Sequence, residues 1–125
     1  MCAAHHGLDN LCVLIDYNKL QSDNRNDAIM RLEPLAAKWR AFEWAIAEID
    51  GHNISEILKT FRRAGSTTGR PSVIIAHTTK GKGVPYMENV ATWHGSVKLT
   101  REQAEDALRA LGASQNEMKE LLDVG

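Results

Sequence analysis

The sequence has few of the features that mark several classes of protein. Its 125 residues include two cysteines, Cys2 and Cys12, without Cys-x-x-Cys spacing, so neither a disulfide framework nor a zinc site is indicated. The longest apolar run, residues 11–15, is far too short to cross a membrane. The formal net charge is −1 and no polybasic tract occurs, which argues against nucleic-acid binding through bulk electrostatics. We expect a cytoplasmic protein with no membrane or nucleic-acid partner.

The residues that are present have the composition of a folded domain. Apolar residues make up 43% of the chain and charged residues 25%, which is typical of globular proteins. A chain of this length forms one domain or part of one. We expect a single partial domain over residues 1–125, with an α/β part over 1–97 and a C-terminal helical pair over 98–125.

Apolar periodicity and capping residues predict alternating strands and helices. The continuous apolar run over residues 11–15 is typical of a strand covered on both faces, in which Cys12 is a small buried residue. Alternating strands and helices favour parallel crossovers, and hence an α/β fold with a mostly parallel sheet and flanking helices. The expected elements are a helix end at 3–7, strands over 11–15, 44–50 and 72–76, and helices that begin after Pro34, Asn53, Thr100 and Ser114.

Two polar segments are predicted to be irregular. Residues 18–27 are rich in Asn, Asp and Ser, which favour turns over regular structure. Residues 80–83 read KGKG, which predicts a flexible cationic loop. No Gly-x-x-x-x-Gly-Lys-Ser/Thr pattern is present, so this loop is not a Walker motif.

Asn18 follows the first predicted strand, where open α/β sheets collect ligands. Its side-chain oxygen suits a hard cation such as Mg²⁺, and the backbone carbonyl of Leu20 could join the same coordination sphere. The alternative is a turn asparagine that satisfies its own backbone. Spacing alone leaves both interpretations open.

The lysines of the KGKG loop and His94 suit an anionic, phosphate-bearing group. Taken alone, the loop favours a solvated basic turn. His94, between Trp93 and Gly95, is by itself typical of a packed loop residue. His77 ends a predicted buried strand and could face a ligand. No nucleophile–base pair can be argued from these residues.

Taken together, these motifs resemble the N-terminal, thiamine-diphosphate-binding domain of the transketolase family. The resemblance runs from about residue 3 to about residue 94, with the motifs in order and at the right spacing. The matching stretches are LDNL (8–11), DYNKLQ (16–21), EPL (33–35), KWRAF (38–42), EIDGH (48–52), IIAHT (74–78), KGKG (80–83) and WHG (93–95).

The resemblance implies site roles for a small set of residues. Asn18 matches the family's asparagine that ligates Mg²⁺ through its side chain, and Leu20 matches the residue that gives this metal a main-chain carbonyl. Lys80 matches a lysine that contacts the cofactor in some members. His94 matches the histidine that lies beside the diphosphate and reaches the sugar substrate, so it is the expected catalytic residue. Gln21 corresponds to another cofactor contact, at a place where the local alignment can slip by one residue.

The family's activity implies what this chain would bind. Transketolases use thiamine diphosphate and Mg²⁺ to transfer a two-carbon ketol unit between sugar phosphates, as in the pentose phosphate pathway. Their signature begins with Gly-Asp-Gly, whose aspartate is the charged metal ligand. No Gly-Asp-Gly occurs among these 125 residues. We therefore expect doubtful cofactor binding and no catalysis by this chain alone.

Two interpretations of function follow. In the first, the chain is a transketolase-like fragment that acts with parts supplied by other polypeptides. In the second, it is a non-catalytic α/β fragment that self-associates, as a dimer or by a domain swap, and serves as a structural or interaction module.

Overall fold

The computed structural model describes residues 1–22, 24–95 and 97–123. The chain divides into two compact units, which are described separately. The sheet unit comprises Met1–Lys19 and Asn26–Thr78, and the helical unit comprises Leu20–Arg25 and Thr79–Gly125. The expected division of the domain near residue 97 stays a prediction.

The sheet unit is built on a three-stranded parallel sheet with the order β1-β5-β4. Its strands are β1 (Cys12–Tyr17), β5 (Ser72–His77) and β4 (Ala45–Asp50). Each predicted strand is therefore confirmed, and no end is shifted by more than two residues. The register aligns the last residues of all three strands, so their carboxyl ends form one edge of the sheet.

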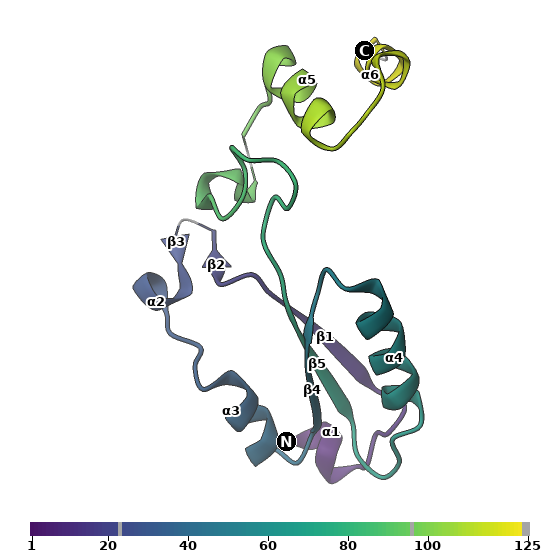
Figure 1. The fold of residues 1–125 in the computed structure, drawn as a ribbon. Coiled ribbons are helices and arrows are strands. Elements are labelled where there is room, and N and C mark those ends of the chain that lie inside the picture. The colour runs from purple at the N-terminus through teal and green to yellow at the C-terminus, as the bar shows by residue number, and fades with distance from the viewer. Residues whose placement is uncertain (23, 96, 124–125) are drawn as a thin grey trace. The chain divides into compact units, whose positions relative to one another are not determined.

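Two helices, α3 (Leu35–Ala41) and α4 (Ile54–Gly65), lie on opposite faces of the sheet (Figure 1). Alternate side chains of β5 face the two helices. Val73 and Ile75 belong to the core cluster that includes Trp39 of α3. Ile74 and Ala76 belong to the cluster that includes Ala64 of α4. The sheet unit also contains the short helices α1 (Cys2–His5) and α2 (Asn26–Ile29).

The predicted capping residues begin their helices as expected. Asn53 Oδ1 accepts a hydrogen bond of 3.1 Å from the Glu56 backbone N–H at the start of α4. Capping boxes begin α5 (Arg101–Ala110) at Thr100 and α6 (Gln115–Leu122) at Ser114. The expected C-terminal helical pair is confirmed, since α5 and α6 contact each other within the helical unit.

The expectation that the first strand is covered on both faces is wrong. Exposed and half-buried residues alternate along β1, and Leu14 is 53% exposed. Cys12, expected to be buried, is exposed as well. The reason is the position of α4, which packs against β4 and β5. The α4-side face of β1, with Cys12 and Leu14, therefore lacks the cover that α3 and its neighbours give Val13, Ile15 and Tyr17 on the other face.

The prediction of an irregular segment over residues 18–27 is also wrong in part. Two short antiparallel strands, β2 (Leu20–Gln21) and β3 (Asn24–Arg25), form there, and α2 begins at Asn26. Asp23, within this segment, lies outside the described residues. In the helical unit, both strands contact the 3₁₀ helix η1 (Ala91–His94). A tertiary contact thus stabilises strands that are too short for sequence periodicity to reveal.

Among the described residues, no helix combines the length and the apolar character needed to cross a membrane.

Candidate functional site

Asn18 lies directly after β1, at the carboxyl edge of the sheet. Its Nδ2 donates a hydrogen bond of 3.3 Å to Asp16 Oδ2. The other carboxylate oxygen of Asp16 accepts a hydrogen bond from the hydroxyl of Thr78, which follows the neighbouring strand β5. The amide of Asn18 is thus oriented through its nitrogen, so its oxygen, the atom a cation would take, points away from Asp16.

Lys19 changes the chain direction between Asn18 and Leu20. Its φ is 63°, in the left-handed region that few non-glycine residues adopt. Its carbonyl accepts a hydrogen bond of 3.0 Å from the Asn26 N–H. The first of the two segments of the sheet unit ends at Lys19. Leu20 begins β2 in the helical unit, where it pairs with Arg25. The two expected metal ligands are therefore separated by one residue with a special backbone conformation.

Lys80 lies in a loop that is held by hydrogen bonds and not in the flexible loop that the sequence suggested. The Lys80 carbonyl accepts from the Asn89 N–H at 3.0 Å, and Glu88 Oε1 accepts from the Gly83 N–H at 2.9 Å. Gly81 has φ +73°, and a Cβ built there would lie 2.6 Å from Met87 Cβ. The glycines thus permit a tight, packed turn that fixes the backbone of Lys80.

His94 is the last residue of η1 and is exposed. Its neighbour Trp93 is half-buried and packs on Tyr86, with ring centroids 5.4 Å apart. The Tyr86 hydroxyl donates to the Gln103 carbonyl at 2.6 Å. Since β2 contacts η1, the helical unit brings the strand of Leu20 and the helix of His94 together. The packing of Trp93 thus holds the backbone that presents the imidazole.

The expected site residues therefore fall in two groups. Leu20, Lys80 and His94 belong to the helical unit, and Asn18 belongs to the sheet unit. The amide oxygen of Asn18 and the carbonyl of Leu20 are oxygen ligands of the kind that Mg²⁺ prefers. Both are neutral, and no group of three or more acidic, His or Cys side chains suited to a metal occurs among the residues described. The donors fit Mg²⁺ in kind and are too few to hold it alone.

A cluster of ionisable side chains lies near the carboxyl edge of the sheet, and only one of them, His77, was singled out from the sequence. His77 Nε2 lies 3.0 Å from Glu48 Oε2, and the rings of Tyr17 and His77 meet edge to face at 5.3 Å. The Tyr17 hydroxyl donates to Glu33. The cluster borders an open cavity of about 460 Å³ on the α3 side of the sheet. His77 thus lines a cavity, and its expected role in facing a ligand stays a prediction.

Burial and the Glu33 carboxylate together raise the pKa of Tyr17 to about 12, with burial the larger cause. The same hydrogen bond lowers the pKa of Glu33. Strand alternation could have placed Glu48 and His77 on one face, because β4 and β5 are parallel. No local pattern could have found Glu33, which reaches Tyr17 from a loop sixteen positions along the chain.

The family described as "Transketolase, thiamine diphosphate binding domain" matches residues 1–121 of this chain. An apulose-4-phosphate transketolase subunit of Phocaeicola vulgatus is 43% identical over 109 residues, covering 87% of this chain and 38% of that protein. The 6-deoxy-6-sulfo-D-fructose transketolase subunit SqwG of a Clostridium species is 42% identical over 111 residues, covering 89% of this chain and 40% of that protein. The chain thus spans about two fifths of the length of these relatives.

The fold is similar to solved transketolases. The structure from Campylobacter jejuni superposes with a TM-score of 0.82 at 28% identity, covering 92% of this chain and 18% of that protein. The transketolase of Leishmania mexicana gives a TM-score of 0.79 at 24% identity, over 99% of this chain and 18% of that protein, which shows a shared fold.

Proposed function

This chain belongs to the transketolase family, within its thiamine-diphosphate-binding domain, and we propose that it provides one face of a site for thiamine diphosphate and Mg²⁺. The observation that carries the proposal is the family match over residues 1–121. The matched range includes Asn18 after β1, the loop of Lys80 and the 3₁₀ helix that ends at His94. The match to relatives covers about two fifths of their length, so the reaction of the complete enzyme is part of the proposal.

Each expected site residue has a role that its chemistry supports. The Asn18 amide oxygen and the Leu20 carbonyl ligate Mg²⁺, which takes oxygen ligands. The Lys80 ammonium and the His94 imidazole bind the diphosphate, since cationic N–H groups make strong hydrogen bonds to phosphate oxygens. His94 also hydrogen-bonds the sugar substrate. The bound cofactor supplies the electron sink for transfer of a two-carbon ketol unit.

The substrates in this proposal are sugar phosphates. One relative is named for apulose 4-phosphate and another for 6-deoxy-6-sulfo-D-fructose, so relatives of this chain act on sugars that carry different anionic groups. The imidazole of His94 is exposed at the end of η1, so a polar substrate can reach it. The two free cysteines also agree with the proposed cytoplasmic location.

We also propose that this chain alone binds the cofactor weakly and is inactive. Mg²⁺ gives up its hydration shell reluctantly, and two neutral oxygens do not compensate for this loss. The purified chain should therefore show no rise of several degrees in its melting temperature with millimolar Mg²⁺ and thiamine diphosphate, since strong binding to the folded state raises this temperature. It should transfer no ketol unit from xylulose 5-phosphate to ribose 5-phosphate. A large rise or measurable transfer would contradict the proposal.

A chimera tests the residue roles in a complete enzyme. The aligned segment of the Phocaeicola vulgatus subunit is replaced by the corresponding residues of this chain, and the product is assayed with the other subunits of that enzyme. Asn18→Ala and His94→Ala should each reduce kcat/KM by at least about tenfold. The exposed His52 is the matched control, and His52→Ala should leave the activity unchanged. Equal losses in all three variants would overturn the assigned roles.

The alternative, a non-catalytic module that self-associates, has one structural observation in its favour. The α4-side face of β1 exposes apolar surface at Leu14, and exposed apolar faces favour association. The two proposals differ in the chimera, because a module without a catalytic role would not support ketol transfer there.

A further inference from the structure

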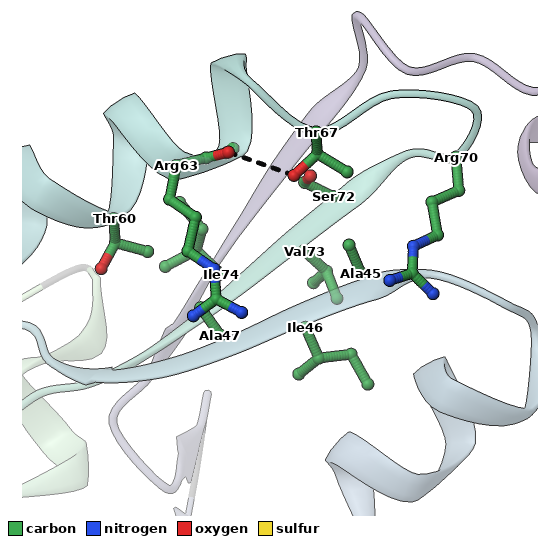
Figure 2. Close-up of a pocket in the computed structure, with 11 residues that line it drawn as sticks. Ala45, Ile46, Ala47, Thr60, Arg63, Thr67, Arg70, Ser72, Val73 and Ile74 are labelled. Carbon is green, nitrogen blue, oxygen red and sulfur yellow. Dashed lines mark hydrogen bonds between the residues drawn. The ribbon is translucent and has the colours of Figure 1, made fainter.

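A small pocket at the amino ends of β4 and β5 has a composition suited to anions (Figure 2). It lies in the sheet unit, on the face covered by α4. Ala45 and Ser72 are the first residues of their strands and are paired in register. The carboxyl edge that carries Asn18 is at the other end of the strands, about 16 Å away for a strand of this length. The pocket is therefore separate from the proposed cofactor site.

Two arginines supply its charge. Figure 2 shows the side chains of Arg63, from α4, and Arg70, from the loop before β5, on two sides of the pocket. No acidic residue is among those that line the pocket. Neither guanidinium forms an ion pair within the described residues 1–22, 24–95 and 97–123. Two cationic groups thus border one pocket, and no carboxylate in the described part of the chain forms an ion pair with them.

The backbone at both arginines is held by hydrogen bonds. The Arg63 carbonyl accepts from Ser66 Oγ at 2.9 Å and from Thr67 Oγ1 at 3.1 Å, the latter drawn in Figure 2. Next to Arg70, the Gly69 N–H donates to Asp9 Oδ2 at 2.9 Å. The backbone positions from which the two arginine side chains extend are therefore held in place.

Ser72 gives an independent indication of a ligand. Ser72 is 5% exposed and lines the pocket, and its Oγ is buried with no hydrogen-bond partner among the residues that the structure describes. A buried hydroxyl that lacks a partner costs free energy, so one is rarely kept without a reason. Thr67 has already donated its hydroxyl hydrogen to Arg63. The Ser72 hydroxyl thus remains a donor available to an occupant of the pocket.

We propose that the pocket lined by Arg63, Arg70 and Ser72 binds a small dianionic oxyanion of the phosphate type. Guanidinium groups match the geometry of phosphate oxygens, and two of them favour a dianion over a singly charged carboxylate. The cavity volume of about 80 Å³ exceeds the roughly 30 Å³ that one water occupies in the liquid. The pocket is therefore large enough for more than a single water.

Titration of the full chain with inorganic phosphate, followed by calorimetry and by amide NMR shifts, tests the proposal. Binding should be saturable and perturb residues of the pocket. Arg63→Gln and Arg70→Gln should each raise the Kd by about tenfold or more, which corresponds to the loss of a charge-assisted hydrogen bond. Arg62→Gln is the matched control, because Arg62 is on the same helix but does not line the pocket. It should leave the Kd nearly unchanged.

Ser72→Ala separates binding from folding, because it replaces a partnerless buried hydroxyl with an apolar group. This variant should melt no lower than the parent chain, yet bind phosphate more weakly. The proposal is overturned if phosphate does not bind saturably up to about 10 mM. It is also overturned if Arg62→Gln weakens binding as much as Arg63→Gln, if Ser72→Ala binds as tightly as the parent, or if acetate binds as tightly as phosphate.

Discussion

Tyr17 is the residue whose surroundings most clearly change its chemistry. It is 7% exposed, and its hydroxyl donates to the Glu33 carboxylate. Burial and this carboxylate raise its pKa from 10.0 to about 12. A raised pKa means that the folded chain holds this proton more tightly than the unfolded chain does. The resulting stabilisation is complete below pH 10 and is lost as the pH rises through about 12.

Tyr17→Phe should therefore reduce the pH dependence of the free energy of unfolding at alkaline pH. In the parent chain, the free energy of unfolding should fall between about pH 10 and pH 12 because the unfolded chain releases the Tyr17 proton first. In the variant this fall should be smaller, and Tyr86→Phe, which removes the other tyrosine hydroxyl, should retain it. Urea denaturation at pH 9, 10, 11 and 12 measures the effect. Identical pH profiles for the parent chain and Tyr17→Phe would contradict the account.

At the scale of elements, sequence patterns that span a few residues predicted the starts of most helices and the three strands of the parallel sheet. The caps at Asn53, Thr100 and Ser114 depend on side chains three residues apart, so the sequence contains all the information they need. The parallel direction of the strands followed from the alternation of strands and helices. The hairpin of β2 and β3 could not be predicted in this way, because its stabilising contact with η1 joins residues about seventy positions apart.

The same limit applies to the candidate site. The motif residues Asn18, Leu20, Lys80 and His94 were found through a family pattern, because each is ambiguous on local grounds. Asn18, Leu20 and Lys80 are half-buried and His94 is exposed, and this depends on how the whole chain packs. The ordered turn at Lys80 depends on the close approach of Met87 to Gly81, which the sequence pattern does not reveal. The exposure of Cys12 depends on which strands α4 covers, and strand periodicity does not encode that.

The loop after Lys80 gives a prediction at the element scale. Gly81→Ala should lower the free energy of unfolding by about 1–3 kcal/mol, because φ is +73° and the new Cβ would meet Met87. Gly65→Ala is the matched control: Gly65 ends α4, and nothing lies within 4 Å of the position that its new methyl group would take. That change should stabilise the chain by about 0.5–1 kcal/mol. Chemical denaturation distinguishes them, and equal effects of the two changes would refute the role given to the turn.

At the scale of the whole molecule, the exposed face of β1 predicts self-association of the isolated chain. Leu14 is 53% exposed on a strand that pairs on only one side within the described sheet. Sedimentation velocity should show a concentration-dependent dimer, and Leu14→Lys should shift it toward monomer. Leu121→Lys, an equal change at an exposed leucine of α6, serves as the control and should not. A parent chain that remains monomeric at all concentrations would contradict this expectation.

The central claim is that this chain forms one face of a site for thiamine diphosphate and Mg²⁺. Amide NMR of the chain, titrated with both ligands together up to about 10 mM, tests it most directly because this method detects millimolar binding. We predict weak, saturable shifts that concentrate at Asn18, Leu20, Lys80 and His94. These shifts should diminish in Asn18→Ala and Lys80→Ala, and Lys119→Ala, a change at an exposed lysine of α6, is the control that should leave them unaffected. Shifts that gather elsewhere, or none at the highest concentration, would contradict the account.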